Sequence, residues 1–260
     1  LEMVSDSPAG EILGETTKEY VFEACGEKLD MAQLQEIWEG KLEPVYPYRK
    51  AGPTVEKING KLSAPAAPKI GVAKPKVIIP VFPGTNCEYD TAKAFARAGA
   101  DPEILVIRNL TPADVAESCK ALVKAIDNSQ IVMLPGGFSG GDEPDGSAKF
   151  IASFFRNPAV TEAVRRLLQQ RDGLMLGICN GFQALIKLGL VPYGDIRPIT
   201  AYDPTLTFNT IGRHQSMLVR TRIASTGSPW LSHCDAGSEY EIAISHGEGR
   251  FVAPQEVLDT

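Results

Sequence analysis

A cysteine between two glycines is the residue of this sequence best suited to chemistry. Cys179 lies in the run GICNG (177–181), between an apolar segment that reads as a strand and one that reads as a helix. This spacing has the form of a nucleophile elbow, in which the glycines leave room for neighbouring backbone. At a helix N-terminus, unpaired amides and the helix dipole stabilise a thiolate. We predict that Cys179 is a catalytic nucleophile; the alternative is a structural cysteine in a tight turn.

A nucleophile that attacks a carbonyl needs hydrogen-bond donors where negative charge develops, each worth about 3–4 kcal/mol in one well-studied enzyme. Gly136 and Gly137 follow another apolar run, and glycine tolerates the dihedral angles that turn an amide into a site. We predict an oxyanion hole formed by the amides of Gly137 and Asn180, with Gly136 and Phe138 beside the substrate. An ordinary tight loop is the alternative.

The thiol also needs a base, and the chain has three histidines. His246 ends an apolar run and Glu248 follows two residues later, so the two could act as base and orienting acid of a Cys-His-Glu triad. The alternative is a polar turn in which His246 only contributes hydrogen bonds to the substrate pocket. His214 and His233 lie in polar, irregular stretches and are expected at the surface.

Three further features have weaker chemical interpretations. Gln183 lies one helical turn after Cys179, where its amide could contact substrate or simply pack the helix. Cys87 could line the same cleft, although a packed small residue is the favoured interpretation. The acidic stretch 142–145 is expected to be a solvated loop rather than a metal site.

The elements around these residues indicate an α/β fold. Continuous apolar runs that alternate with amphipathic segments predict a parallel sheet with helices on both faces, with its site at the carboxyl ends of the strands. The expected strands are 77–82, 103–107, 131–134 and 174–178. The expected helices are 90–98, 111–127, one that begins at 157, and 180–188, which ends at Gly189. Polar, β-rich segments such as 217–220 and 241–244 follow.

The first part of the chain differs in character. Residues 1–49, with a strand over 20–24 and a helix over 31–39, are too few for a core of their own and read as the tail of a preceding domain. Residues 50–75 are rich in Pro and Gly and read as a linker, which leaves 76–260 as the main domain. Because the chain begins on Leu1, we expect a processed or excised piece of a longer product.

Composition excludes several classes of function. The net charge of −6, with no basic accumulation, argues against a nucleic-acid partner. No apolar run approaches the roughly 20 residues needed to span a membrane, and the start has no signal-peptide pattern. Five cysteines without a C-x-x-C pair indicate neither a disulfide framework nor a zinc site, so a reducing, cytoplasmic setting is expected.

Four segments together resemble the triad-type (class I) glutamine amidotransferases. They are FPGTNC (82–87), PGGFS (135–139), GICNGFQ (177–183) and SHGEG (245–249). Within that family they are most similar to the glutaminase domains of the synthases that make formylglycinamidine ribonucleotide in purine biosynthesis. The resemblance implies a flavodoxin-like sheet and a glutamyl thioester on Cys179. Ammonia would pass to a synthase domain in the same chain or complex, where ATP and Mg²⁺ bind; no cofactor is expected in this domain.

One departure from the family pattern bears on the base. The resemblance places the triad His and Glu in a later His-Pro-Glu block, which this sequence does not contain before it ends at Thr260. We therefore expect a C-terminally incomplete domain with little glutaminase turnover alone, and pocket roles for His246 and Glu248. Two other interpretations stay open: a flavodoxin-like cysteine hydrolase or chaperone, and a catalytically silent interaction module.

Overall fold

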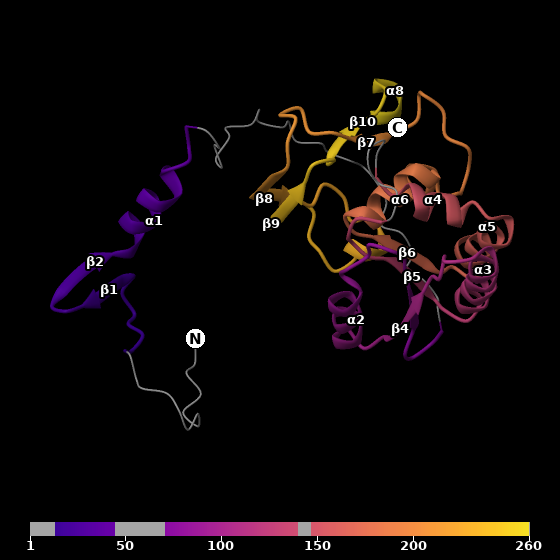
Figure 1. Ribbon diagram of the computed structural model, residues 1–260, viewed down its shortest axis with the longest axis horizontal. Coiled ribbons are helices and arrows are strands. Elements are labelled where there is room, and N and C mark those ends of the chain that lie inside the picture. The colour runs from indigo at the N-terminus through magenta and orange to yellow at the C-terminus, as the bar shows by residue number, and fades with distance from the viewer. Residues whose placement is uncertain (1–13, 45–70, 140–146, 260) are drawn as a thin grey trace. The chain divides into compact units, whose positions relative to one another are not determined.

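The computed structural model describes residues 14–44, 71–139 and 147–259. The chain divides into two compact units, Leu1–Glu56 and Lys57–Thr260, and each is described by itself. Figure 1 shows the larger unit as a layered arrangement of strands and helices.

A four-stranded parallel sheet forms the centre of the larger unit (Figure 1). In spatial order its strands are β4 (Asp101–Val106), β3 (Lys76–Val81), β5 (Ile131–Leu134) and β6 (Leu174–Gly177). Because all four strands run in the same direction, the loops at their carboxyl ends lie along one edge of the sheet.

Helices follow each of these strands. They are α2 (Glu88–Arg97), α3 (Pro112–Asp127), α4 (Lys149–Phe155), α5 (Pro158–Arg165) with the π-helical turn η1 (Arg166–Gln170), and α6 (Asn180–Leu188). Successive residues of β3 point to opposite faces of the sheet, as the pleat requires. Ile78 therefore packs with residues of α3, α4, α5 and α6, whereas Val77 and Ile79 pack with residues of α2. Both faces of the sheet are covered.

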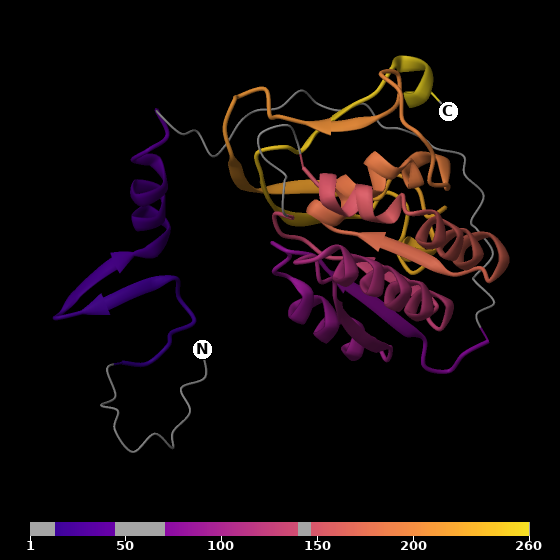
Figure 2. The same ribbon diagram turned by 45° about the vertical axis from the view of Figure 1, so that its right-hand side comes forward.

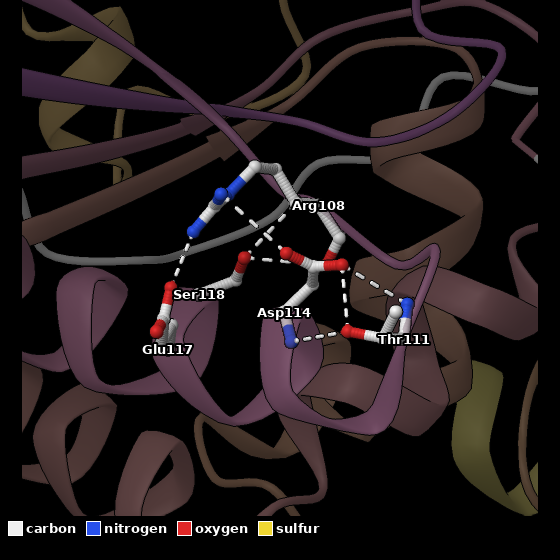
Figure 3. Close-up of polar contacts among 5 residues, drawn as sticks. All are labelled: Arg108, Thr111, Asp114, Glu117 and Ser118. Carbon is white, nitrogen blue, oxygen red and sulfur yellow. Dashed lines mark hydrogen bonds and ion pairs between the residues drawn. The ribbon is translucent and has the colours of Figure 1, made fainter.

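The loop between β4 and α3 is held at both of its ends (Figure 3). Thr111 and Asp114 form a capping box, in which the Thr111 hydroxyl accepts from the Asp114 amide and the Asp114 carboxylate accepts from the Thr111 amide. The Ser118 hydroxyl accepts from the Arg108 amide and donates to the Arg108 carbonyl. The Arg108 guanidinium reaches the carboxylates of Asp114 and Glu117. This loop therefore leaves the sheet edge in a fixed conformation.

After α6 the chain forms short elements and two antiparallel strand pairs, seen from a second side in Figure 2. The elements are α7 (Leu190–Tyr193), β7 (Thr205–Thr207), β8 (Gln215–Arg222), the 3₁₀ turn η2 (Pro229–Leu231), β9 (Glu239–His246), β10 (Arg250–Val252) and α8 (Gln255–Leu258). Strand β8 pairs with β9, and β7 pairs with β10. The SHGEG segment (245–249) consists of the last two residues of β9 and the turn to β10, and is called the SHGEG turn below.

The smaller unit contains a hairpin followed by a helix. Its described elements are β1 (Val21–Ala24), β2 (Glu27–Asp30) and α1 (Met31–Gly40). None of the residues in these three elements is buried, in agreement with the expectation that so short a segment holds no core.

The predicted α/β architecture is confirmed. The four strands and the helices at 88–97, 112–127, 158–165 and 180–188 lie within a few residues of their predicted ranges. Helix α4, strands β2, β7 and β10, and helices α7 and α8 were not predicted, because they are short and lack a clear period. Most of the predicted linker lies outside the described residues, so the domain boundaries stay a prediction. Over the described ranges, no helix has the length and apolarity to cross a bilayer.

Candidate active site

Cys179 occupies a strained position between β6 and α6. Its backbone has φ 54° and ψ −113°, a conformation that residues with a side chain rarely adopt, and the residue is exposed. Cys179 is also the N-cap residue of α6, and the amide of Gln183 donates to its carbonyl at 3.0 Å. The thiol is thus presented at a helix N-terminus on a sharp turn, as the sequence predicts.

The two glycines that flank Cys179 are required by close backbone contacts. A Cβ on Gly181 would lie 2.0 Å from the carbonyl oxygen of Leu134, the last residue of β5. A Cβ on Gly177 would lie 2.6 Å from the carbonyl oxygen of Gly181. Both distances are far below van der Waals contact. Helix α6 can therefore approach the sheet this closely only because residues 177 and 181 are glycines, which have no Cβ.

The loop after β5 lies directly beside the nucleophile. A Cβ on Gly136 would be 3.3 Å from Cys179 Cβ. Gly137 has φ 136°, and a Cβ there would meet the Gly84 carbonyl oxygen at 2.5 Å. The amide of Phe138 donates to the same oxygen at 2.9 Å, which locks the two strand-end loops together. In the described part of the chain no acceptor is recorded for the Gly137 amide, so this N–H is available as a donor.

A cavity of about 180 Å³ brings most of the predicted site residues together. The predicted residues that line it are Gly137, Phe138, Cys179, Gln183, His246 and Glu248. Gly136 lies against Cys179 without lining the cavity, and Asn180 is only 2 % exposed behind it. All eight residues are therefore clustered around Cys179, while the catalytic roles assigned to them stay predictions.

Hydrogen bonds link the elbow to the turn between β9 and β10. The side chain of Asn180 accepts from the Ser139 amide at 3.4 Å and donates to Gln183 Oε1 at 3.1 Å. Gln183 Nε2 in turn donates to the Glu248 carbonyl oxygen at 2.9 Å. Both ends of the Gln183 amide are thus occupied by protein, which favours the packing interpretation of this residue over direct substrate contact.

His246 and Glu248 have different partners from those that a Cys-His-Glu triad would give them. The Glu248 carboxylate accepts hydrogen bonds from the amide and hydroxyl of Ser147. His246 Nδ1 bonds to Asn209 Oδ1 at 3.0 Å. Glu248 therefore connects the turn to the segment before α4, and Asn209, rather than Glu248, orients the imidazole ring of His246.

Several lining residues were not predicted from the sequence. They are Ser147, Phe208, His214, Ser245 and Gly247. His214 was expected at the surface; it is exposed but also lines the cavity, where its Nε2 lies 2.9 Å from the Ser245 hydroxyl. The β8–β9 pairing brings these two residues together, and no local pattern signals it.

Cys87 lies close to the nucleophile. A Cβ on Gly136 would be 3.5 Å from Cys87 Sγ, compared with 3.3 Å from Cys179 Cβ. Partial desolvation of the sulfur by neighbouring atoms raises the pKa of the Cys87 thiol, and the charge of the nearby Cys179 raises it further. Cys87 is exposed rather than packed inside, so the favoured sequence interpretation is wrong in that respect. A higher pKa keeps Cys87 protonated and therefore poorly nucleophilic.

Two larger cavities lie elsewhere in this unit. One, of about 370 Å³, lies at the carboxyl ends of β3 and β4 beside Arg108, and the other, of about 500 Å³, lies beside Arg197. Neither is lined by a cysteine or histidine, so the smaller cavity is the better candidate site. Among the described residues no cluster of three potential metal ligands occurs, and the acidic stretch 142–145 lies outside them.

A parallel sheet with a cysteine on a sharp strand-to-helix turn at its carboxyl edge, and a glycine loop beside the thiol, is typical of flavodoxin-like α/β domains with a candidate cysteine nucleophile. The model of the CobB/CobQ-like glutamine amidotransferase domain family matches residues 74–260, and the chain belongs to this family. The resemblance seen in the sequence is confirmed.

Named relatives and a solved structure agree with this assignment. The phosphoribosylformylglycinamidine synthase subunit PurQ of Rubrobacter xylanophilus is 34% identical over 183 residues, which cover 70% of this chain and 69% of that protein. The subunit of the same name from Mycolicibacterium paratuberculosis is 37% identical over 185 residues, covering 71% and 68%. The structure of PurLQS from Thermotoga maritima is similar with a TM-score of 0.52 at 24% identity, covering 70% of this chain and 71% of that one, which supports the flavodoxin-like fold.

Proposed function

We propose that this domain hydrolyses glutamine through Cys179 and supplies the ammonia for formylglycinamidine ribonucleotide synthesis. The observation that carries the proposal is the strained Cys179 elbow beside the available Gly137 amide in one cavity. The curated relatives, which are subunits of phosphoribosylformylglycinamidine synthase, support this choice of pathway.

The reaction follows from the positions of the nucleophile and the donors. The Cys179 thiolate attacks the side-chain carboxamide carbon of glutamine, and the negative charge that develops on the carbonyl oxygen is stabilised by the amides of Gly137 and Asn180. The proton that the Cys179 thiol lost on ionisation is returned to the carboxamide nitrogen, the C–N bond breaks, and the nitrogen leaves as ammonia. The carbonyl carbon stays bonded to sulfur as a glutamyl thioester. Water attacks the thioester and releases glutamate with the free thiol.

The acceptor of the ammonia is a separate synthase active site. Amination of formylglycinamide ribonucleotide requires activation of its amide oxygen, which ATP and Mg²⁺ would supply in the synthase. The described part of this chain offers no metal cluster, and the sequence contains no phosphate-binding P-loop pattern. Because the named relatives are subunits of a synthase, the proposed partner is an ATP-dependent synthase in the same chain or complex.

Covalent labelling tests this proposal directly. In the assembled synthase, a diazoketone analogue of glutamine should label Cys179, and Cys179→Ala should abolish both labelling and glutamate release. Cys234→Ala, whose residue does not line the cavity, serves as the matched control and should leave both unchanged. Glutaminase turnover that survives Cys179→Ala would disprove the proposal, and labelling only by simple ester substrates would instead favour a cysteine hydrolase.

A further inference from the structure

Asn209 holds the SHGEG turn through its side-chain amide. Asn209 Nδ2 donates to the carbonyl oxygens of His246 at 2.8 Å and Arg213 at 3.1 Å. Its backbone amide also donates to the Gly247 carbonyl at 2.8 Å. Because carbonyl oxygens only accept hydrogen bonds, these contacts fix which end of the side-chain amide is the nitrogen.

The orientation of Asn209 decides where the proton of the neighbouring imidazole lies. With Nδ2 used as a donor, Oδ1 faces His246 Nδ1 at 3.0 Å and can only accept. The neutral His246 ring must therefore carry its proton on Nδ1. Its other nitrogen, Nε2, then has a lone pair and acts as an acceptor.

The ring is also held in place by packing. A Cβ on Gly249 would lie 2.3 Å from both Nδ1 and Cε1 of His246, so the Gly249 backbone lies tight against that side of the ring. In the described ranges no hydrogen-bond partner is recorded for His246 Nε2, although His246 lines the cavity that contains Cys179. This leaves a fixed, unused acceptor at the candidate active site.

Two other side chains of the cavity have polar atoms that already bond to protein. The amide of Gln183 bonds to Asn180 and to Glu248, and one carboxylate oxygen of Glu248 bonds to Ser147. A general base for the Cys179 thiol would be expected within hydrogen-bond reach of its sulfur. Among the described residues, no hydrogen bond joins His246 to Cys179. Glutamine, in contrast, brings N–H donors in its carboxamide and its α-ammonium group.

We propose that Asn209 is a positioning residue that fixes His246 with its proton on Nδ1, so that Nε2 accepts a hydrogen bond from a nitrogen of bound glutamine. The inference rests on the proposed glutaminase function. It assigns His246 to substrate recognition and Asn209 to the tautomer that makes this recognition possible.

The first test observes the tautomer of His246 directly, in the protein with both residues intact, and uses variants for assignment and comparison. In the assembled enzyme with ¹⁵N-labelled histidine, the His246 signals, identified by their loss in His246→Gln, should show a protonated Nδ1 and an unprotonated Nε2. A ring protonated on Nε2 instead would overturn the proposal. Asn209→Ala should convert the single tautomer into a mixture, which a purely structural role for Asn209 would not do.

The second test measures glutamine binding in a Cys179→Ser background, where the substrate is not consumed. Asn209→Ala and His246→Ala should each weaken glutamine binding about tenfold, as expected for one lost hydrogen bond. His233→Ala and Asn128→Ala are the matched controls, since both residues are exposed and neither lines the cavity. Unchanged affinity in both site variants would overturn the proposal.

Kinetics with intact Cys179 separate recognition from base catalysis. His246→Ala should raise KM with kcat changed less than about threefold, whereas a loss of kcat by several orders of magnitude at unchanged affinity would identify a base and overturn the proposal. A diazoketone at saturating concentration should still label Cys179 in this variant. If His246→Ala is labelled and its glutamine affinity is unchanged, only this inference is refuted. If the unmodified enzyme is not labelled, the glutaminase function itself is refuted.

Discussion

Gln183 Nε2 donates a 2.9 Å hydrogen bond to the carbonyl oxygen of Glu248, a residue 65 positions further along the chain. Gln183 belongs to helix α6, whose N-cap is Cys179, and Glu248 belongs to the turn that follows His246. This single bond therefore connects the nucleophile to the opposite wall of the cavity. Its loss should affect both the stability and the shape of the site.

Replacing Gln183 with Ala should destabilise the domain and reduce its activity. Gln183 is only 9 % exposed, so Asn180 and Glu248 would each lose a hydrogen-bond partner that water cannot easily replace. We expect a loss of about 1–3 kcal/mol in the free energy of unfolding, measured by urea denaturation, together with slower glutamate release. Gln255→Ala removes an exposed amide far along the chain and should have no such effect; equal stability of the two variants would contradict the prediction.

Adding a methyl group at Gly181 should displace the nucleophile. The new Cβ would lie 2.0 Å from the Leu134 carbonyl oxygen, which is backbone and cannot move without disturbing β5. Gly181→Ala should therefore lower the free energy of unfolding by about 1–3 kcal/mol. It should also abolish nearly all labelling of Cys179 by the glutamine analogue. Gly40→Ala is the matched control because nothing lies within 4 Å of its Cβ. A Gly181→Ala protein with normal melting and labelling would show that the close contact is wrong.

The alkylation of Cys87 should depend on Cys179. Burial and then the charge of Cys179 raise the pKa of Cys87, so less thiolate is present at a given pH and alkylation by iodoacetamide is slower. In Cys179→Ala the second cause disappears while burial remains. The rate-versus-pH curve of Cys87, followed by mass spectrometry, should then move to lower pH yet stay above that of an unfolded peptide. A curve that does not move would show that the two thiols do not interact.

Asp203 should contribute a stabilisation that disappears in acid. The amide of Thr200 and then the hydroxyl of Tyr193 donate to its carboxylate and lower its pKa to about 2, from an ordinary value of 3.8. A lowered pKa in the folded state stabilises the protein above the unfolded pKa, and this contribution is lost as the pH falls through about 2. Asp203→Asn should thus melt at lower temperature than the parent protein at pH 7.

The same comparison at low pH supplies the check on Asp203. The difference in melting temperature between Asp203→Asn and the parent should shrink steadily from pH 4 toward pH 2. Asp235→Asn, which changes an exposed carboxylate, should show no comparable trend. A difference that stays constant with pH would mean that the hydrogen bonds to Asp203 do not favour its ionised form.

Much of the architecture could be predicted because its signals are local. Apolar runs of strand length, the Thr111 N-cap followed by Pro112, and Gly189 after the last helical turn each depend on residues a few positions apart. The elbow is local too, since Gly177, Cys179 and Gly181 lie within five positions. Such patterns restrict the backbone directly, whatever the rest of the chain does.

The sequence by itself therefore determined the α/β class, the family and the identity of Cys179 as the candidate nucleophile. Only the tertiary structure decided the partners of the SHGEG turn: Asn209 for His246, 37 positions away, and Ser147 for Glu248, 101 positions away. The nearest acid in sequence suggested a His-Glu pair, but two residues along an extended strand or its turn need not face each other. A side-chain hydrogen bond requires a particular distance and direction, and for distant residues these are set by how the sheets and turns pack together.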